Sequence, residues 1–171
     1  MSNPDGAIVF TDIVGFTEFT AEAGDDAAVL VLERQDAVVR KLLPPDARVV
    51  KELGDGLLLW FPDARLAIVT CLGLQESFRV ESRPELPLWV RMGVHWGRPR
   101  RRGDDLVGHD VNLTARVAAT AGPGELVATD AAVSAAGPSI DGVRVDEIGP
   151  VFVRGVRDPV RLYRVTAAAS A

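Results

Sequence analysis

An aspartate stands in the middle of the first apolar segment of the chain. The segment reads AIVFTDIV over residues 7–14, and its β-branched residues predict a buried strand. Asp12 conflicts with that prediction, because burying an unpaired carboxylate costs several kcal/mol. A strand tolerates such a residue only where another group compensates its charge. The fold must therefore supply that group from elsewhere in the chain.

Helical and strand patterns alternate along the rest of the chain. Gly15 ends the first strand, and Thr17 is placed to cap a helix behind it. A second helical pattern over 27–43 stops at a pair of prolines. Two apolar segments then flank the Gly-Asp-Gly sequence of residues 54–56, which is a hairpin signature. The later predicted elements are a helix after Asp63, a strand over 88–96, a polar loop over 98–105, a helix over 111–121, and strands over 125–129, 143–148 and 160–165.

This order of elements predicts an α+β fold. Hairpin pairing mixed with helices indicates one mainly antiparallel sheet with helices packed against it. The length of 171 residues suits one domain, 1–171, with a core over about 7–165. Residues 166–171 read as a short loose tail.

Composition excludes several classes of protein. The chain is 47% hydrophobic and 25% charged, so it can build a core and is not disordered. The net charge of -5 argues against nucleic-acid binding. Cys71 is the only cysteine, which excludes an internal disulfide and fits a reducing compartment. We find no signal peptide and no membrane span, so the expected location is the cytoplasm.

Asp55 is a candidate partner for Asp12. A strand and an adjacent hairpin can bring the two carboxylates together, where they repel each other unless a cation lies between them. Mg²⁺ takes oxygen ligands of this kind, often with substrate phosphates. The alternatives are that Asp12 ends its strand and hydrogen-bonds the next turn, and that Asp55-Gly56 is an ordinary hairpin turn.

Three ordered motifs and the C-terminal segment resemble those of a known family. The segments FTDIVGFT, KELGDG and DLVGHDVNLTARV, followed by VRGVRDPVRLYRV, resemble the class III nucleotidyl cyclase catalytic domain. The match runs over about residues 7–165 and is most like small actinobacterial adenylyl cyclases. The resemblance implies a ferredoxin-like α+β domain that works as a homodimer with active sites at the interface.

The resemblance also implies roles for single residues. The two carboxylates, with the backbone carbonyl of Ile13, hold two divalent ions, Mg²⁺ or Mn²⁺. Lys51 and Asp105 read the purine, and the segment at the first helix contacts the triphosphate. In the family the metal ligands come from one subunit, and the purine and ribose residues come from its partner. The implied set is Asp12, Ile13 and Asp55 for metal, Gly15, Phe16, Thr17 and Arg154 for phosphates, Lys51 and Asp105 for the base, and Asn112 and Arg116 for catalysis.

These residue types suit the cyclisation of a nucleoside triphosphate. The ribose 3′-oxygen attacks the α-phosphorus, pyrophosphate leaves, and the cation of Arg116 stabilises the charge that accumulates on the phosphoryl oxygens. Asn112 lies four residues before Arg116, on the same helix face. Lys51 donates and Asp105 accepts, which matches adenine and not guanine, so ATP is the predicted substrate. Arg154 replaces the lysine that is frequent in the family, and the two are not equivalent in geometry.

Rival interpretations remain open at this point. Guanylyl cyclases in the family usually carry Glu and Cys-like residues at the two base-reading positions, and GTP is the first alternative substrate. A catalytically silent nucleotide-binding dimer and a plain ferredoxin-like interaction domain are the other two. Asp105 can also be an ordinary loop acid beside Asp104, and the match to the family can be displaced by one residue between these two aspartates. The arginines over 98–102 favour a solvated hairpin tip.

Overall fold

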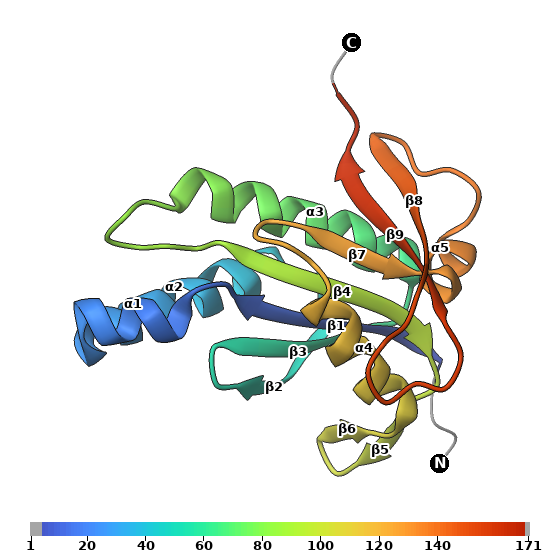
Figure 1. Ribbon diagram of the computed structural model, residues 1–171, viewed down its shortest axis with the longest axis horizontal. Helices are drawn as coiled ribbons and strands as arrows, with labels where there is room; N and C mark the ends of the chain where they lie inside the picture. Colours follow the sequence, from blue (N-terminus) through green and yellow to red (C-terminus); the bar gives the residue numbers. More distant parts are fainter. Residues whose placement is uncertain (1–4, 170–171) are drawn as a thin grey trace.

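The fold is built around a seven-stranded sheet. The computed structural model describes residues 5–169. The strands lie in the order β2-β3-β1-β4-β7-β9-β8 (Figure 1). β4 and β7 run parallel, and all other neighbours in the sheet run antiparallel. The strands are β1 (Gly6–Ile13), β2 (Arg48–Leu53), β3 (Gly56–Phe61), β4 (Val90–Gly97), β7 (Leu126–Thr129), β8 (Val143–Val151) and β9 (Val160–Ala167).

Helices cover both faces of this sheet. Side chains of α2, α3 and α5 share one large buried cluster with the sheet, and α4 packs on the opposite face. No helix within residues 5–169 has the length and apolar character that crossing a membrane requires. The arrangement confirms the predicted α+β class with a mainly antiparallel sheet. The helices are α1 (Phe16–Ala23), α2 (Asp25–Leu42), α3 (Ala64–Glu81), α4 (His109–Ala119) and α5 (Asp130–Ala136).

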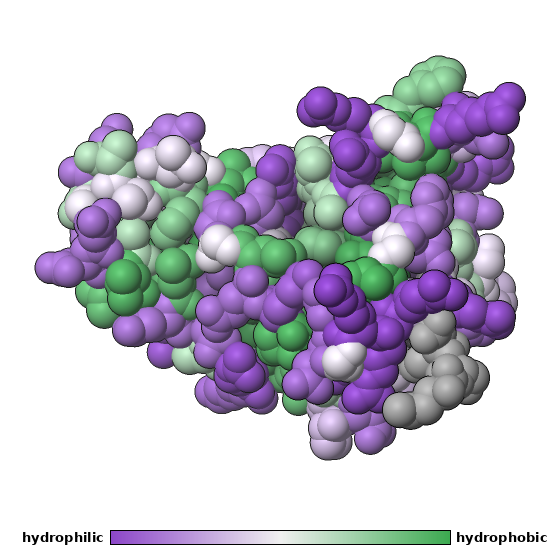
Figure 2. Space-filling model, turned by 90° about the horizontal axis from the view of Figure 1, so that it is seen from below, coloured by the Kyte–Doolittle hydropathy of each residue, from purple (hydrophilic) through white to green (hydrophobic). Residues whose placement is uncertain are grey.

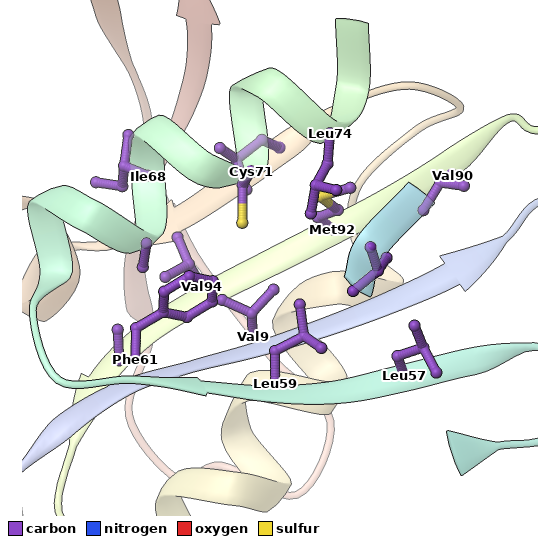
Figure 3. Close-up of a cluster of buried hydrophobic side chains, with 14 of the residues drawn as sticks. Val9, Leu57, Leu59, Phe61, Ile68, Cys71, Leu74, Val90, Met92 and Val94 are labelled. Atoms are coloured by element: carbon purple, nitrogen blue, oxygen red, sulfur yellow. The ribbon is translucent and has the colours of Figure 1, made fainter. Parts of the chain in front are cut away.

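The larger core lies between the sheet and α3. α3 begins where the carboxylate of Asp63 accepts a hydrogen bond from the Leu66 amide at 2.7 Å, as the sequence predicts. Its buried face places Cys71 over Phe61 and Val9 of the strands (Figure 3). Burial raises the pKa of the Cys71 thiol to about 12, so this residue behaves as a small hydrophobic side chain.

Alternation along β1 decides which face each functional side chain meets. Val9 belongs to the cluster under α3, whereas Ile8 packs in a smaller cluster with Val111 of α4. Side chains two residues apart on a strand share a face. Asp12 therefore lies on the α4 side of the sheet, and its neighbour Thr11 lies on the side of α2 and α3.

Large hydrophobic side chains also reach the surface. Phe152, in the connection between β8 and β9, is 81% exposed, and Leu30 of α2 is 61% exposed. Seen from below, hydrophobic side chains gather in the middle of the molecule and at the end formed by α1 and α2 (Figure 2). Exposed apolar patches of this kind mark surfaces that contact other molecules.

Thr17 does not cap α1, contrary to the prediction. The helix begins at Phe16, and Gly15 occupies the N-cap position without a side-chain hydrogen bond. Gly15 has φ 75°, a left-handed conformation that glycine adopts without strain. The turn between β1 and α1 therefore depends on the left-handed conformation that Gly15 can adopt, and not on the Thr17 hydroxyl.

The predicted polar loop over 98–105 contains a small hairpin. β5 (Arg100–Arg102) pairs with β6 (Asp105–Val107) through a turn at Gly103, which has φ 62°. The sequence did not predict this pairing, because strands are recognised by alternating apolar residues and these strands are mostly charged.

Two features of the C-terminal part also differ from the prediction. α5 is seven residues long, too short for a helical period to be recognised, and Thr129 caps it by accepting from the Ala132 amide at 3.2 Å. The tail is ordered further than expected, since β9 continues to Ala167, which pairs with Val143. Residues 170 and 171 of the predicted tail lie outside the described residues.

Candidate active site

Asp12 is paired with a guanidinium group. The antiparallel register of β1 and β4 places Asp12 opposite Arg91. The Nε and Nη2 atoms of Arg91 lie 2.9 and 2.7 Å from Oδ2 of Asp12, and Nη1 donates to the Ala119 carbonyl of α4 at 3.3 Å. Each of the two paired side chains is 31% exposed. Arg91 therefore compensates the charge that the sequence left without a partner.

Asp55 joins Asp12 at the end of the hairpin. The register pairs Asp12 with Gly56, so the β2–β3 turn that carries Asp55 lies beside the end of β1. The pKa of Asp55 is raised to about 6, first by burial and then by the hydrogen bond and the negative charge of Asp12. The positive charge of Arg91 opposes this shift. The two carboxylates thus repel each other, as the sequence predicted for this pair.

A hollow of about 230 Å³ opens next to Asp12. Asp12, Arg91 and Leu53 line it, together with small side chains of α4 that leave the space free. Residues 5–169 include no group of three or more His, Cys, Asp or Glu side chains suited to holding a metal. Asp12 is the acid in the lining of this hollow, and Asp55 lies beside it in the adjoining turn. A cation between the two acids would complete its shell with carbonyl, water or phosphate oxygens. That donor set, two carboxylates and further oxygens, fits Mg²⁺ or Mn²⁺. The α4 residues of the lining are Ala115, Ala118 and Ala119.

Lys51 and Asp105 meet in an ion pair. The Lys51 Nζ atom lies 2.9 Å from Oδ1 and 3.0 Å from Oδ2 of Asp105. The hydrogen bond from Lys51 holds the pKa of Asp105 below its usual value. Asp104 contributes only its backbone here, since its carbonyl accepts from Arg48 Nη1 at 2.9 Å. The pairing thus favours Asp105 over its neighbour as the partner of Lys51.

Asn112 and Arg116 lie one turn apart on the exposed side of α4. No hydrogen bond within residues 5–169 joins either side chain to Asp12 or Asp55. Arg116 instead packs against Gly155, where an added Cβ atom would lie 3.4 Å from the guanidinium. Arg154 is exposed in the same connection between β8 and β9. The expected catalytic pair therefore faces outward, next to the segment that carries Arg154.

A buried imidazole fixes the first turn of α4. His95 of β4 is 7% exposed, and its Nε2 atom lies 3.1 Å from Asp110 Oδ1 while Nδ1 lies 2.8 Å from the Thr129 hydroxyl. Burial lowers the pKa of His95, against the opposing effect of Asp110. A neutral ring that donates from Nε2 and accepts at Nδ1 satisfies all three groups. Asp110 also accepts from the Arg98 amide at 2.8 Å. His95 is therefore a structural residue that links β4 to Asp110 and Thr129.

The segment after Asp12 leads directly into the N-terminus of α1. Ile13 is 2% exposed, and the chain turns at the exposed Gly15 into α1. Phe16 packs against the large core, while Thr17 is exposed in the first turn. The first amides of a helix have no partner within the helix and attract anions.

Sequence reasoning missed Arg91. The residue lies in the predicted strand over 88–96, but nothing local distinguishes it from a solvated arginine at a strand edge. Its signal is the pairing of β4 with β1 in a register that sets Arg91 across from Asp12. That register is visible only when both strands are placed in the sheet.

Comparison with known proteins identifies relatives along nearly the whole chain. Residues 2–167 match the family model described as adenylate and guanylate cyclase catalytic domain. A pH-sensitive adenylate cyclase of Mycobacterium tuberculosis is 32% identical over 95% of this chain. The chain covers 41% of that relative, so it spans less than half of the relative's length.

Solved structures show the same fold. An adenylate cyclase of Trypanosoma brucei superposes with a TM-score of 0.81 at 24% identity, covering 96% of this chain and 92% of that one. The guanylate cyclase domain of RhGC from Catenaria anguillulae, solved with GTP, also superposes with a TM-score of 0.81, at 20% identity over 99% of this chain and 100% of that one. Since cyclases named for either nucleotide share the fold, the fold alone does not select the base.

Proposed function

This chain belongs to the adenylate and guanylate cyclase catalytic domain family, and we propose that it forms one catalytic domain that converts ATP to 3′,5′-cyclic AMP and pyrophosphate. The observation that carries the proposal is that Asp12 and Asp55 lie close together. Arg91 pairs with Asp12 and connects β1 to α4. Two neighbouring carboxylates repel each other, so this arrangement lowers the stability of the fold. They suit a site where a cation relieves the repulsion.

Asp12, Asp55 and the carbonyl of Ile13 would hold the two divalent ions of this reaction. Bound there, such ions would acidify the attacking hydroxyl and neutralise charge on the phosphates. The bond that forms joins the ribose 3′-oxygen to the α-phosphorus, and the bond that breaks joins that phosphorus to the oxygen of the leaving pyrophosphate. The hydroxyl proton passes to solvent.

The protein's own groups bind and orient the triphosphate. The first amides of α1, at Phe16 and Thr17, would donate to phosphate oxygens. Arg91 lies close enough to Asp12 to serve either the acid or a bound phosphate. Arg154 would contribute a further positive charge from the β8–β9 connection. These groups would hold the α-phosphorus next to the attacking ribose 3′-oxygen. Such positioning speeds displacement reactions at phosphorus.

The base and ribose would be held by residues that lie away from the two acids. Lys51 would donate to a ring nitrogen of adenine, and Asp105 would accept from its amino group. The existing ion pair keeps both side chains ready for these roles. Asn112 would orient the ribose, and Arg116 would stabilise the charge that develops on the α-phosphate.

We propose that a complete site needs two copies of the chain. Asn112 and Arg116 are exposed and not bonded to the acid pair of their own chain within residues 5–169. Phe152 adjoins the Arg154 segment and is 81% exposed, so a second copy that contacts this segment would bury its ring. A homodimer would place Arg116 of one copy beside the acids of the other.

Product analysis tests the proposal. The purified chain is incubated with ATP or GTP and with Mg²⁺ or Mn²⁺, and cyclic nucleotide and pyrophosphate are measured. We expect equal amounts of cyclic AMP and pyrophosphate from ATP, and much less product from GTP. Preferential cyclic GMP formation would overturn the assignment of the base. Absence of product from both nucleotides would overturn the proposed reaction, and a melting temperature raised by ATP with Mn²⁺ would then indicate a silent nucleotide-binding module.

A further inference from the structure

Gln35 is a buried amide in the middle of an apolar helix stripe. The buried residues of α2 recur with helical spacing, and four of the five are alanine or valine. Gln35 occupies the central position of this stripe and is 2% exposed. A leucine would fill such a position without desolvating a polar group. Packing alone therefore does not explain the amide. The stripe consists of Ala28, Val31, Gln35, Val38 and Val39.

The amide connects α2 to both segments that carry the acid pair. Nε2 of Gln35 donates to the Asp55 carbonyl at 3.3 Å, and Oε1 accepts from the Thr11 hydroxyl at 3.5 Å. The same hydroxyl accepts from the Leu57 amide at 3.0 Å. Thr11 immediately precedes Asp12, and Leu57 follows Asp55 by two residues. Three segments that are distant in sequence thus meet at one side chain.

Gln35 makes these contacts on the face of the sheet opposite to the side chain of Asp12. Thr11 faces α2, while Asp12 faces α4, because neighbouring side chains on a strand point to opposite faces. Gln35 therefore reaches the proposed site only through the backbone carbonyl of Asp55 and the hydroxyl of Thr11, and it bonds neither carboxylate of the acid pair. It can influence that site only through the backbone of the strand and the hairpin turn.

We propose that Gln35 is a positioning residue that sets the distance between Asp12 and Asp55, and thereby the affinity of the proposed site for divalent ions. The inference rests on the proposed function. The hairpin turn contains Gly54, which has φ 64° and gives the backbone beside Asp55 more conformational freedom than another residue would. Anchoring the Asp55 carbonyl to a buried helix removes that freedom before the cation arrives. Groups that orient metal ligands in this way typically change metal affinity about 10- to 100-fold when removed.

The test measures Mn²⁺ binding and does not depend on turnover. Free Mn²⁺ is followed by electron paramagnetic resonance in the presence of an ATP analogue with a methylene group between the α and β phosphorus atoms, which cannot release pyrophosphate. Gln35→Met keeps the length of the side chain and removes both polar atoms. We expect its Mn²⁺ affinity to fall about 10- to 100-fold. In turnover assays the half-saturating Mn²⁺ concentration rises, and excess Mn²⁺ restores much of the rate.

Val39→Ala is the matched control. Val39 is fully buried on the same helix face and has no polar atom to connect to the hairpin. Its truncation lowers the melting temperature and should leave Mn²⁺ affinity within about twofold. Thr11→Val removes the other member of the link with little change in shape. Its effect and that of Gln35→Met should not add in the double variant, because both break one connection. Thr11→Val also supplies the test if Gln35→Met does not fold.

The possible outcomes separate this inference from the proposed function. Binding of Mn²⁺ by the unmodified chain, with equal affinity in Gln35→Met and Thr11→Val, would overturn the inference and leave the function standing. No binding of Mn²⁺ by the unmodified chain would overturn the proposed metal site itself. A loss of affinity in Gln35→Met that Val39→Ala reproduces would show a general effect of stability and would also overturn the inference.

Discussion

Asp12 and Arg91 face each other across adjacent strands, and two guanidinium nitrogens lie 2.7 and 2.9 Å from one carboxylate oxygen. This ion pair answers the question that a charged residue in an apolar strand raises. It also means that Asp12 has a partner before any cation arrives. Binding of a metal must therefore compete with, or share, the contact with Arg91.

Arg91→Met should destabilise the chain most when no divalent ion is present. Without the guanidinium, Asp12 and Asp55 repel each other uncompensated, and we expect a loss of about 1 kcal/mol, or roughly 2–4 °C in Tm. Mn²⁺ should then raise Tm more in Arg91→Met than in the unmodified chain. Thermal unfolding with and without Mn²⁺ measures both. Arg34→Met, which breaks the exposed pair with Glu81, is the control and should not change the response to Mn²⁺; an equal response in both variants would contradict the prediction.

Asp55→Asn should stabilise the metal-free chain above neutral pH. The folded-state pKa of Asp55 is about 6, above the ordinary value of 3.8, so the folded state binds the proton more tightly. Its ionised form therefore reduces stability above pH 6, and this penalty disappears as the pH falls towards 4. Solvent screening keeps the gain below about 1 kcal/mol, which corresponds to up to about 3 °C in Tm. Melting curves at pH 8 and pH 4 should show a gain at the first value only, and no gain for the exposed Asp46→Asn; a loss of stability at pH 8 would refute this account.

Lys51→Glu should weaken the use of ATP and disturb the base site. It replaces an ion pair of 2.9 Å with two facing carboxylates and removes the donor to adenine. We expect kcat/KM for ATP to fall about 10- to 100-fold, the effect of leaving a buried polar group unpaired. Adding Asp105→Cys should shift the ratio of kcat/KM values towards GTP. Asp104→Asn should change neither value, and a large effect of that control would transfer the role to Asp104.

Asp12→Ala and Arg116→Ala should each be inactive but restore activity when mixed. In a mixed dimer one of the two sites contains intact Asp12 and intact Arg116 from different copies. Random exchange makes half of the dimers mixed, so about a quarter of the sites are complete. Cyclic AMP formation after subunit exchange measures the recovery. Exchange demonstrated by mixed labels, with no recovered activity, would count against a site shared between copies.

His95→Gln should reduce the sensitivity of the fold to acid. The pKa of the buried His95 is lowered, so the unfolded chain binds the proton more readily and stability is lost as the pH falls below about 6.5. One such group contributes at most about 1.4 kcal/mol per pH unit. Tm of His95→Gln should be lower at pH 7.5 but should fall less between pH 7 and 5. His109→Gln, at an exposed position, should follow the unmodified chain, and parallel curves for all three proteins would contradict the assignment.

The order of most elements and the residue types of the candidate site follow from local patterns in the sequence. Apolar period, prolines and the Gly-Asp-Gly turn are local signals, and they located β1, the β2–β3 hairpin and α3 within a few residues. The ordered motifs indicated the family and placed Asp12, Asp55, Lys51 and Asp105 in two groups. Two elements were not predicted: α5, because it is too short to show a helical period, and the β5–β6 hairpin, because it contains too few apolar residues to show alternation.

Which side chains compensate one another depends on contacts between residues that are distant in the sequence. Arg91 is 79 residues from Asp12, and Gln35 is 24 residues from Thr11. Such contacts follow from strand register and from the packing of α2 on the same face of the sheet as α3. A shift of one residue in register would turn each side chain to the opposite face. Local patterns do not encode that register, because it is selected by the packing of the whole core. For this reason the acids of the site could be predicted from the sequence, whereas the guanidinium and the amide that hold them could not.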